Sequence, residues 1–273
     1  MTVSARPASG GAARTVAACL AILQRDLRAV LRSRSQLYSS LVFPLMLLAV
    51  LGTGVSHGLD PSSARIRNGD YESFLVPGLI VMTALFSSTF SSASYYQDRD
   101  SGVLRVMLAS PHSPPVILLG KALAGVVIGS VQALALLGIA ALLPGIDLEW
   151  QYGAVSGVLL TALAVVLLAT FLNGLAQFMA ARIRTMGGFH LVMNLLLFPL
   201  LFFSGAFFPL GDLPFWLKAL ATANPLSYAV DLIHIAVYTS DSGHFGLGFD
   251  LVVLGLLAPA TFLLGIGRRV PQP

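Results

Sequence analysis

Long apolar stretches alternate with shorter polar ones along most of the chain. Six of these stretches have a length close to or above the roughly 20 residues that a helix needs to cross a bilayer. They are residues 37–55, 74–93, 122–143, 155–180, 188–208 and 249–267. They contain no Asp, Glu, Lys or Arg except Asp250, at the start of the last stretch. Because a charge at bilayer depth is unfavourable, the pattern predicts an all-α integral membrane protein with six transmembrane helices.

Composition favours the same class. Hydrophobic residues make up 56% of the 273 residues and charged residues only 10%, with a mean hydropathy of +0.83. A soluble domain carries about a quarter charged residues, so this chain has too little polar surface to be one. Its single cysteine, Cys19, excludes an internal disulfide. Only Lys121 and Lys218 of the 16 basic residues are lysines, a bias that favours a GC-rich bacterial genome and hence a bacterial plasma membrane.

Basic residues predict the orientation, since they concentrate on the cytoplasmic side of membrane proteins. With the N-terminus inside, 13 of the 16 basic residues fall in cytoplasmic segments. The other three, Arg65, Arg67 and Lys218, fall in outer loops. An even number of spans then places both termini in the cytoplasm.

The chain before the first span divides into two parts. Residues 1–14 are rich in Ser, Gly, Ala and Pro without a period, which predicts a disordered cytoplasmic tail. Residues 15–36 predict an amphipathic helix in the membrane interface, and the alternative is a solvated helix that leads into the first span. Its polar side holds Arg25, Asp26, Arg28, Arg32 and Arg34, and its apolar side Leu20, Ile22, Leu23, Leu27, Val30 and Leu31. Residues 37–273 form the six-span domain.

The predicted cytoplasmic loop between the second and third spans, residues 95–119, carries a dense motif. Asp98-Arg99-Asp100 is followed by Gly102, then Val103-Leu104-Arg105, and later by Leu108-Ala109-Ser110-Pro111. Charges that alternate with apolar residues predict a short amphipathic helix, which Ser110-Pro111 would stop. The alternative is a surface linker whose charges contact water and lipid headgroups.

The predicted outer stretch at residues 209–248 is too apolar for an ordinary loop. Two turn motifs lie at residues 204–209 and 224–228, with the sequences Ser204-Gly205-Ala206-Phe207-Phe208-Pro209 and Asn224-Pro225-Leu226-Ser227-Tyr228. Between them, residues 213–223 predict a short amphipathic helix, with Phe215 and Trp216 suited to a membrane interface.

In this order on six spans, the motifs resemble those of the ABC-2 type permeases of ATP-binding cassette exporters. The resemblance covers nearly the whole chain after Thr15 and includes Leu118-Leu119-Gly120-Lys121. It implies that a cytoplasmic coupling helix docks into an ATPase subunit through Asp98, Arg99, Asp100, Gly102, Leu104 and Arg105. It also implies short re-entrant helices before span six, with turns shaped by Ser204, Gly205, Pro209, Asn224, Pro225 and Tyr228.

Two further positions refine the resemblance. His234 stands where the family often has Arg or Gln. The sequence Phe74-Leu75-Val76-Pro77-Gly78 looks most like the drug-resistance and lipo-oligosaccharide export permeases of the family.

A nucleotide site of the Walker type is excluded, because Gly120-Lys121 is followed by Ala122 and position 115 is proline. The resemblance therefore implies a permease that moves a drug, lipid or lipid-linked glycan out of the cell. ATP and Mg²⁺ would bind a separate ATPase subunit, with no cofactor, metal or catalytic residue on this chain. The other expected partners are a second permease copy or a similar permease, and membrane lipids, but no nucleic acid.

Polar residues within the predicted spans are few. Gln132, Asn173, Gln177 and Asn194 are candidates for lining a translocation path. The alternative for each is an interhelical hydrogen bond, which is common in membrane bundles. Asp231 is assigned to the outer short-helix region rather than to a proton carrier.

Two other classes of function stay open. An ion-driven secondary transporter usually places acidic residues or broken helices near the membrane midplane, whereas the carboxylates here lie outside the central spans. A membrane-embedded enzyme or assembly factor would need converging catalytic groups. The histidines show no ligand spacing that would support it, at His57, His112, His190, His234 and His244.

Overall fold

The computed structural model describes residues 11–58, 71–109, 114–143, 146, 148, 150–210, 214–238 and 244–266. In this part of the chain the regular secondary structure is entirely helical, as the sequence predicts. The helices are α1 Gly11–Arg32, α2 Arg34–Gly58, α3 Tyr71–Asp100, α4 Val103–Leu108, α5 Pro114–Ala140, α6 Ala154–Ala180, α7 Met186–Phe202, α8 Phe215–Ala223, α9 Pro225–Val237 and α10 Leu247–Ile266.

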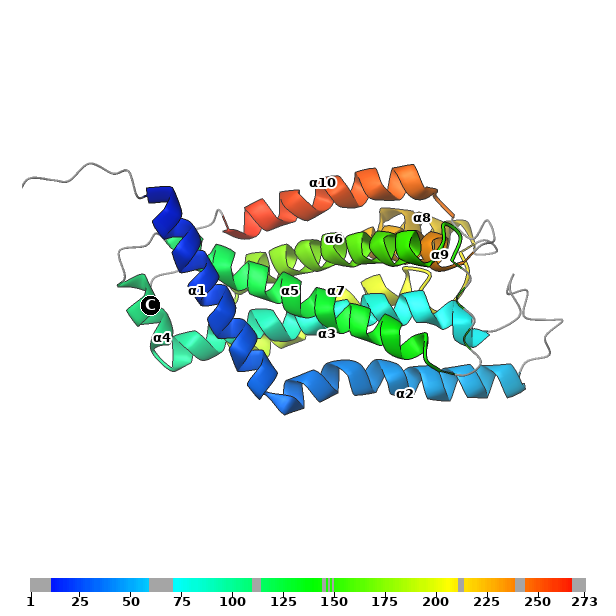
Figure 1. Ribbon diagram of the computed structural model, residues 1–273, viewed down its shortest axis with the longest axis horizontal. Helices are drawn as coiled ribbons and strands as arrows, with labels where there is room; N and C mark the ends of the chain where they lie inside the picture. The colour runs from blue at the N-terminus through cyan, green and yellow to red at the C-terminus, as the bar shows by residue number, and fades with distance from the viewer. Residues whose placement is uncertain are drawn as a thin grey trace, which may run out of the picture.

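Six helices, α2, α3, α5, α6, α7 and α10, run along the long axis of the molecule and alternate in direction (Figure 1). α3 is central, in contact with α2, α5, α6, α7 and α9. α1 crosses one end of the bundle near α4, and α8 and α9 lie at the opposite end (Figure 1). We call these the α1/α4 end and the α8/α9 end.

Four helices, α3, α5, α6 and α10, are long and apolar enough to cross a membrane. The chain is therefore a multi-pass membrane protein. α2 and α7 occupy the first and fifth predicted spans, but the described apolar part of α2 is Ser40–Gly52 and α7 has only 17 residues. At about 1.5 Å per residue, α7 is about 26 Å long, slightly short of a hydrocarbon core of about 30 Å. Six crossings remain a prediction.

The fifth predicted span is longer than the helix that fills it. The apolar pattern extends to residue 208, whereas α7 ends at Phe202. Gly205 takes a φ of 81°, a left-handed conformation that helices do not continue through. A Cβ at this glycine would lie 2.9 Å from the Leu210 Cγ, so crowding also favours glycine. Residues 203–208 therefore form a turn, although most of them are apolar.

α1 lies where the sequence predicts a helix, but its bounds and faces differ. Residues 11–14 of the predicted tail belong to α1, and residues 1–10 lie outside the described residues. Asp26, which the pattern places on the polar side, is buried, while Leu20 and Leu31 are exposed. The reason is that Lys121 of α5 pairs with Asp26 and stabilises a carboxylate on the buried face. The location of α1 in the membrane interface stays a prediction.

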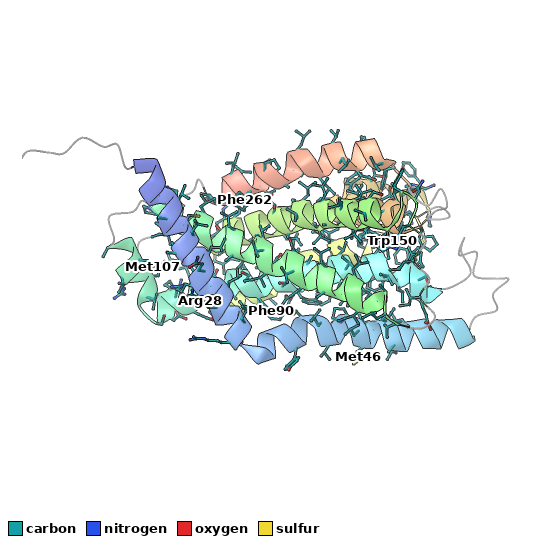
Figure 2. All side chains as sticks on the ribbon, in the orientation of Figure 1. Arg28, Met46, Phe90, Met107, Trp150 and Phe262 are labelled. Carbon is teal, nitrogen blue, oxygen red and sulfur yellow. The ribbon has the colours of Figure 1, made fainter. Side chains whose placement is uncertain are left out.

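Many large apolar side chains point away from the bundle. Met46 projects outward from α2 and is about half exposed (Figure 2). Others cover the outer faces of α6, α7 and α10, namely Val155, Leu159, Leu163, Leu191, Leu195, Phe198, Val252, Leu256, Leu263 and Leu264. An apolar surface of this extent suits lipid tails or a second chain, not water.

Two glycines bring α6 and α10 into direct backbone contact. A Cβ on Gly174 would lie 2.5 Å from the Phe262 backbone N, and one on Gly265 would lie 2.7 Å from the Gly174 O. The Thr261 hydroxyl donates across the same contact to the Phe171 O (3.4 Å). Small residues at such interfaces let membrane helices gain close van der Waals packing.

Gly174→Ala should therefore destabilise the fold by about 1–3 kcal/mol, because the new methyl group has no room at the α6–α10 contact. Gly138→Ala is the matched control, since no atom lies within 4 Å of a Cβ at Gly138 on α5. Alanine there should be neutral or stabilising by up to about 1 kcal/mol. Thermal unfolding of the two purified variants in detergent tests this, and equal unfolding temperatures would contradict it.

Candidate coupling site

α3 and α4 join at a sharp change of direction. Between them, Gly102 takes a φ of 77° and a ψ of −5°. Its N–H donates to the Arg99 O (3.2 Å), and its O accepts from the Arg105 N–H (3.1 Å). A Cβ at Gly102 would meet nothing within 4 Å, so the left-handed backbone alone favours glycine. The predicted short helix is present as α4, and its predicted stop at Ser110-Pro111 lies outside the described residues.

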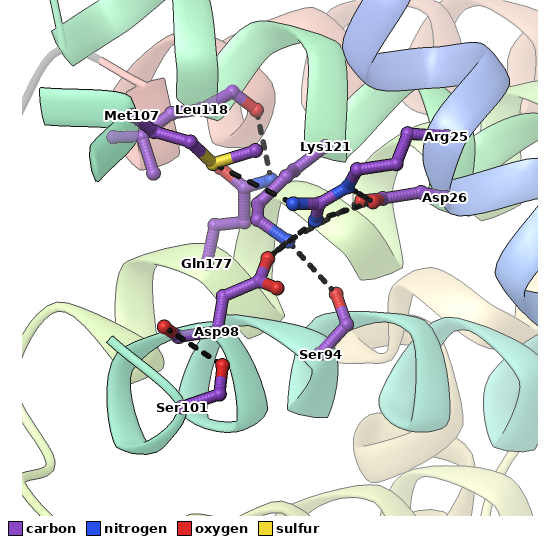
Figure 3. Close-up of polar contacts among 9 residues, drawn as sticks. All are labelled: Arg25, Asp26, Ser94, Asp98, Ser101, Met107, Leu118, Lys121 and Gln177. Carbon is purple, nitrogen blue, oxygen red and sulfur yellow. Dashed lines mark hydrogen bonds and ion pairs between the residues drawn. The ribbon is translucent and has the colours of Figure 1, made fainter. Parts of the chain in front are cut away.

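The Asp98 carboxylate is bound within the protein. Its Oδ2 pairs with the Arg25 Nη2 of α1 (2.5 Å) and with the Lys121 Nζ of α5 (Figure 3). Lys121 also lies 3.3 Å from the Asp26 Oδ2 and donates to the Ser94 Oγ (3.2 Å). We call Arg25, Asp26, Asp98 and Lys121 the charge cluster. Its two cations and two carboxylates join three helices and balance formally, as buried charges must for a stable fold.

Arg25 lies at the edge of the charge cluster. Burial alone would lower the pKa of its guanidinium, but hydrogen bonds to Asp98 and Asp26 outweigh burial and raise the pKa above its ordinary value. Its Nη1 also approaches the Met107 Sδ of α4 at 3.7 Å (Figure 3). The charge cluster therefore connects α1 with α4 as well as with α3 and α5.

Gly120 and Lys121 end the Leu-Leu-Gly-Lys motif, and each has a physical role. Lys121 is almost fully buried, so its charge needs the carboxylates around it. A Cβ on Gly120 would lie 2.9 Å from the Ile22 Cβ and 3.1 Å from the Cys19 O. Glycine at this position therefore lets α1 lie directly on α5, beside the charge cluster.

A second set of contacts ties the end of α3 to the segment after α6. The Tyr96 hydroxyl donates to the Ile183 O (3.0 Å), and the Arg99 Nη2 donates to the Arg184 O (2.5 Å). The Arg99 guanidinium lies over the buried Tyr96 ring, 5.4 Å from its centroid. Arg99 is thus held by its own chain, like Asp98.

The residues predicted to contact an ATPase divide into two environments. Leu104 is buried, and Asp98 and Arg99 are partly buried with their polar groups bound within the protein, whereas Asp100 and Arg105 face outward. The side chain of Asp98 is 15% exposed and that of Asp100 is 66% exposed, although the two lie in the same turn. Val103 and Val106 add exposed apolar area on α4. We call the surface of Asp100, Val103, Arg105 and Val106 the α4 face.

Three members of the charge cluster are not predicted as site residues. The sequence pattern assigns Arg25 and Asp26 to the polar side of a helix and Lys121 to the start of a span. Two features of the sequence could have marked these residues as paired charges. Asp26 is the one acidic residue in α1, and Lys121 is the one Asp, Glu, Lys or Arg between residues 106 and 146. The pairings themselves join residues 73 and 95 positions apart, which no local pattern reveals.

The four candidates for a translocation path do not gather in one place. The Asn173 Nδ2 donates to the Ser88 Oγ of α3 (3.0 Å), an interhelical bond of the kind that the alternative interpretation expects. Gln177 donates to a backbone carbonyl of α5 (3.2 Å). Gln132 is buried, and its amide has no hydrogen-bond partner among the described residues. Asn194 is exposed on α7. Their role in a path stays a prediction.

The two turn motifs meet at the α8/α9 end. Asn224 caps α9, because its Oδ1 accepts from the Leu226 N–H (3.0 Å). Its Nδ2 donates to the Leu200 O near the end of α7 (2.5 Å). The Tyr228 hydroxyl donates to the Thr222 O of α8 (2.5 Å). The second motif therefore holds α7, α8 and α9 together.

The remaining motif residues shape the backbone of the same region. Pro225 occupies the first turn of α9, where a missing N–H is tolerated. The Ser204 hydroxyl donates to the Leu201 O (2.6 Å), Gly205 supplies the left-handed turn and Pro209 follows it, exposed. The turn is tied to α3, since the Tyr71 hydroxyl donates to a carbonyl within it, that of Phe207 (3.1 Å). A re-entrant position in the outer leaflet stays a prediction.

The sequence of this chain is similar to those of known membrane transport proteins. The profile of the ABC-2 type transporter family matches residues 17–238. The daunorubicin resistance ABC transporter permease protein DrrB1 of Streptomyces coeruleorubidus is 26% identical over 272 residues, which cover 97% of this chain and 90% of that protein. A Cyanophora paradoxa protein named as transport permease ycf38 is 28% identical over 243 residues, 84% of this chain and 80% of its own. Nodulation protein J of Sinorhizobium fredii is 26% identical over 220 residues, 78% and 79% of the two chains.

Asp98→Asn should lower the free energy of unfolding by about 2–3 kcal/mol, because it leaves the buried Lys121 with Asp26 as its only carboxylate. Asp100→Asn makes the same chemical change on an exposed side chain and should alter stability by less than about 0.5 kcal/mol. Denaturant unfolding of both variants in detergent measures the difference. Similar losses in the two variants would show that the charge cluster does not stabilise this end of the bundle.

Proposed function

Because the chain belongs to the ABC-2 type transporter family, we propose that it is the transmembrane permease of an ATP-binding cassette exporter. A separate ATPase subunit would bind ATP and Mg²⁺ and drive transport. The observation that supports this most directly is the α4 face, a group of exposed side chains on α4 and at the end of α3, beside the buried Leu104 and the ion-paired Asp98.

The α4 face suits docking because exposed charged and apolar side chains lie together on it, and the residues beneath it are bound to the rest of the protein. Asp100 and Arg105 could pair with opposite charges of an ATPase, and Val106, 73% exposed, could enter an apolar pocket. α4 continues from α3 through Gly102 and contacts α1 through Arg25 and Met107. Movement of the ATPase would therefore displace α3 and α1 together with α4.

The proposed exporter function also gives the orientation of the chain in the membrane. The α1/α4 end would face the cytoplasm, where an ATPase finds its nucleotide, and the basic residues concentrate on that side. Both termini would then be cytoplasmic and the α8/α9 end would lie in the outer leaflet. α2 and α7 would complete six crossings, with the turn at residues 203–208 extending the short α7 toward the membrane surface.

The substrate class follows from the apolar surfaces. The exposed faces of α6, α7 and α10 carry aliphatic and aromatic side chains, with Asn194 as a polar group on α7. A second permease copy and membrane lipids would cover them, and a hydrophobic or amphiphilic molecule could move between the copies. The name of DrrB1, which refers to daunorubicin resistance, agrees with a drug as substrate. Family membership weighs against an ion-driven secondary transporter.

Arg105→Glu should weaken ATPase binding about tenfold or more, since reversing a charge at a docking surface places like charges in contact. The permease and its ATPase subunit would be co-expressed, and the ATPase retained on the affinity-tagged permease would be quantified. ATP-dependent uptake of a fluorescent amphiphilic dye into inverted vesicles should fall in parallel, while the unfolding temperature of the permease stays unchanged.

Lys218→Glu is the control, because it makes the same change of charge on α8 at the opposite end. It should retain the ATPase like the unsubstituted protein. Equal retention by the Arg105→Glu variant would reject docking at the α4 face. Dye transport that needs an ion gradient and no ATP would reject the exporter.

A further inference from the structure

The part of α1 that α5 leaves uncovered presents two flanks of different chemistry. α5 covers one side of α1, on which Cys19 and Asp26 are buried. The first exposed flank is apolar and consists of Val16, Leu20 and Leu31, each at least half exposed. We call these three residues the apolar flank. Apolar side chains in a row along an amphipathic helix are typical of a surface that meets lipid tails.

The second exposed flank is basic. Arg25, Arg28 and Arg32 recur at spacings of three and four residues, so they lie along one stripe of the helix. We call these three residues the arginine stripe. The small side chains of Ala21 and Ala29 leave an open groove along it. At about 3.6 residues per turn, the arginine stripe lies about a third of a turn away from the apolar flank.

The arginine stripe is not neutralised within the described part of the chain. Each described carboxylate at the α1/α4 end pairs with a cation other than Arg28 and Arg32. These carboxylates are those of Asp26, Asp98 and Asp100. Arg28 and Arg32 are exposed one helical turn apart, and residues 1–10, which precede α1, contain no Asp or Glu. Like charges at this spacing repel each other, so the two arginines favour a bound anion.

The position of α4 shows which way the two flanks face. The Arg25 Nη1 lies 3.7 Å from the Met107 Sδ of α4, and α4 lies at the outer edge of this end of the molecule (Figure 1). The arginine stripe therefore faces the end of the bundle. Val16 and Leu20 lie about 180° and about 140° from Arg25 around the helix axis. The apolar flank therefore faces back along the long helices.

We propose that the arginine stripe binds the phosphate group of an anionic phospholipid while the apolar flank packs on lipid tails. Helices such as α3 and α5 are long enough to cross the bilayer, so hydrocarbon lies along them and headgroups lie at their ends. The two flanks of α1 face these two regions in the same order. Arg28 and Arg32 each present a planar fork of N–H donors that fits phosphate oxygens, whereas Arg25 stays bound to Asp98.

A phospholipid fits this surface better than a soluble partner does. An acidic protein surface would meet the arginine stripe and leave the apolar flank uncovered. A phospholipid supplies an anion and an apolar chain in one molecule, and an anionic leaflet attracts arginines near its surface. Because the charge cluster ties α1 to α3 and α5, the bound lipid would stabilise the whole α1/α4 end. The site needs neither ATP nor an ATPase subunit, so it goes beyond the exporter proposal.

Binding of phosphatidylglycerol to the full chain in detergent tests the site. The lipid should raise the unfolding temperature, and phosphatidylcholine with the same acyl chains should raise it less. Arg28→Gln combined with Arg32→Gln should raise the Kd for phosphatidylglycerol about tenfold or more, because two guanidinium groups lose their contact with the phosphate. Both residues are exposed, so the double variant should fold.

Arg182→Gln combined with Arg184→Gln is the matched control. It removes two exposed arginines from the segment after α6, which Tyr96 and Arg99 hold at the same end of the bundle. The loss of charge is the same in the two double variants. The control should therefore keep the Kd of the unsubstituted protein, because its arginines lie outside the arginine stripe.

A fluorescent label on a single cysteine measures the direction of the apolar flank. Cys19 is the only cysteine of the chain, so Cys19→Ala provides the background. Leu20→Cys and Ala29→Cys then place labels on opposite sides of α1, both at exposed positions. In lipid nanodiscs, brominated acyl chains should quench the label at residue 20 strongly and the label at residue 29 weakly.

Several results would overturn the lipid site. Equal effects of phosphatidylglycerol and phosphatidylcholine would leave only apolar packing. Inorganic phosphate that raises the unfolding temperature as much as the lipid would assign a free anion. An equal rise of Kd in the control variant would assign a general positive field, and equal quenching at residues 20 and 29 would reject the orientation of α1. An unchanged Kd in the Arg28 and Arg32 variant, with loss of a co-expressed ATPase, would assign the arginine stripe to a protein partner.

Discussion

Burying a charge in an apolar medium is unfavourable by several kcal/mol, and this constraint shapes both ends of the bundle. At the α1/α4 end, Lys121 is buried because Asp98 and Asp26 reach it from two other helices. At the α8/α9 end, Asp231 is buried where two backbone N–H groups bind it. Between these ends the helices pack through apolar and small residues, as at Gly174. Charge pairs therefore hold α1 against α3 and α5, and apolar and small residues determine how closely the other helices lie.

The sequence predicts the features that depend on neighbouring residues. Apolar stretches locate α3, α5, α6 and α10, and the left-handed turn at Gly102 occurs within the motif that predicts a short helix. α3 continues seven residues past its predicted end at residue 93, because Tyr96 binds the segment after α6 and Asp98 pairs with residues of other helices. A local pattern carries no information on which helices meet, so it misses the charge cluster and the binding of Asp231 to the backbone at His244 and Phe245.

The two acidic residues of the Asp98-Arg99-Asp100 motif illustrate how one motif serves two purposes. Asp98 binds cations of two other helices, whereas Asp100 is open to a partner. Their side chains point in different directions, since residues two apart lie on different faces of a helix. A motif of this kind can thus join the bundle on one side and offer a docking surface on the other, and its stability and its docking can be altered separately.

α3 runs unbroken for 30 residues from Tyr71 to Asp100, even though it contains Pro77. At about 1.5 Å per residue it is about 45 Å long, and its ends are fixed to the turn at residues 203–208 by Tyr71 and to α4 through Gly102. A rigid rod of this length that pivots about its middle by about 5° moves each end by about 2 Å in opposite directions. If α3 tilts as a rigid unit, a small displacement at the α1/α4 end would therefore produce an opposite displacement at the α8/α9 end.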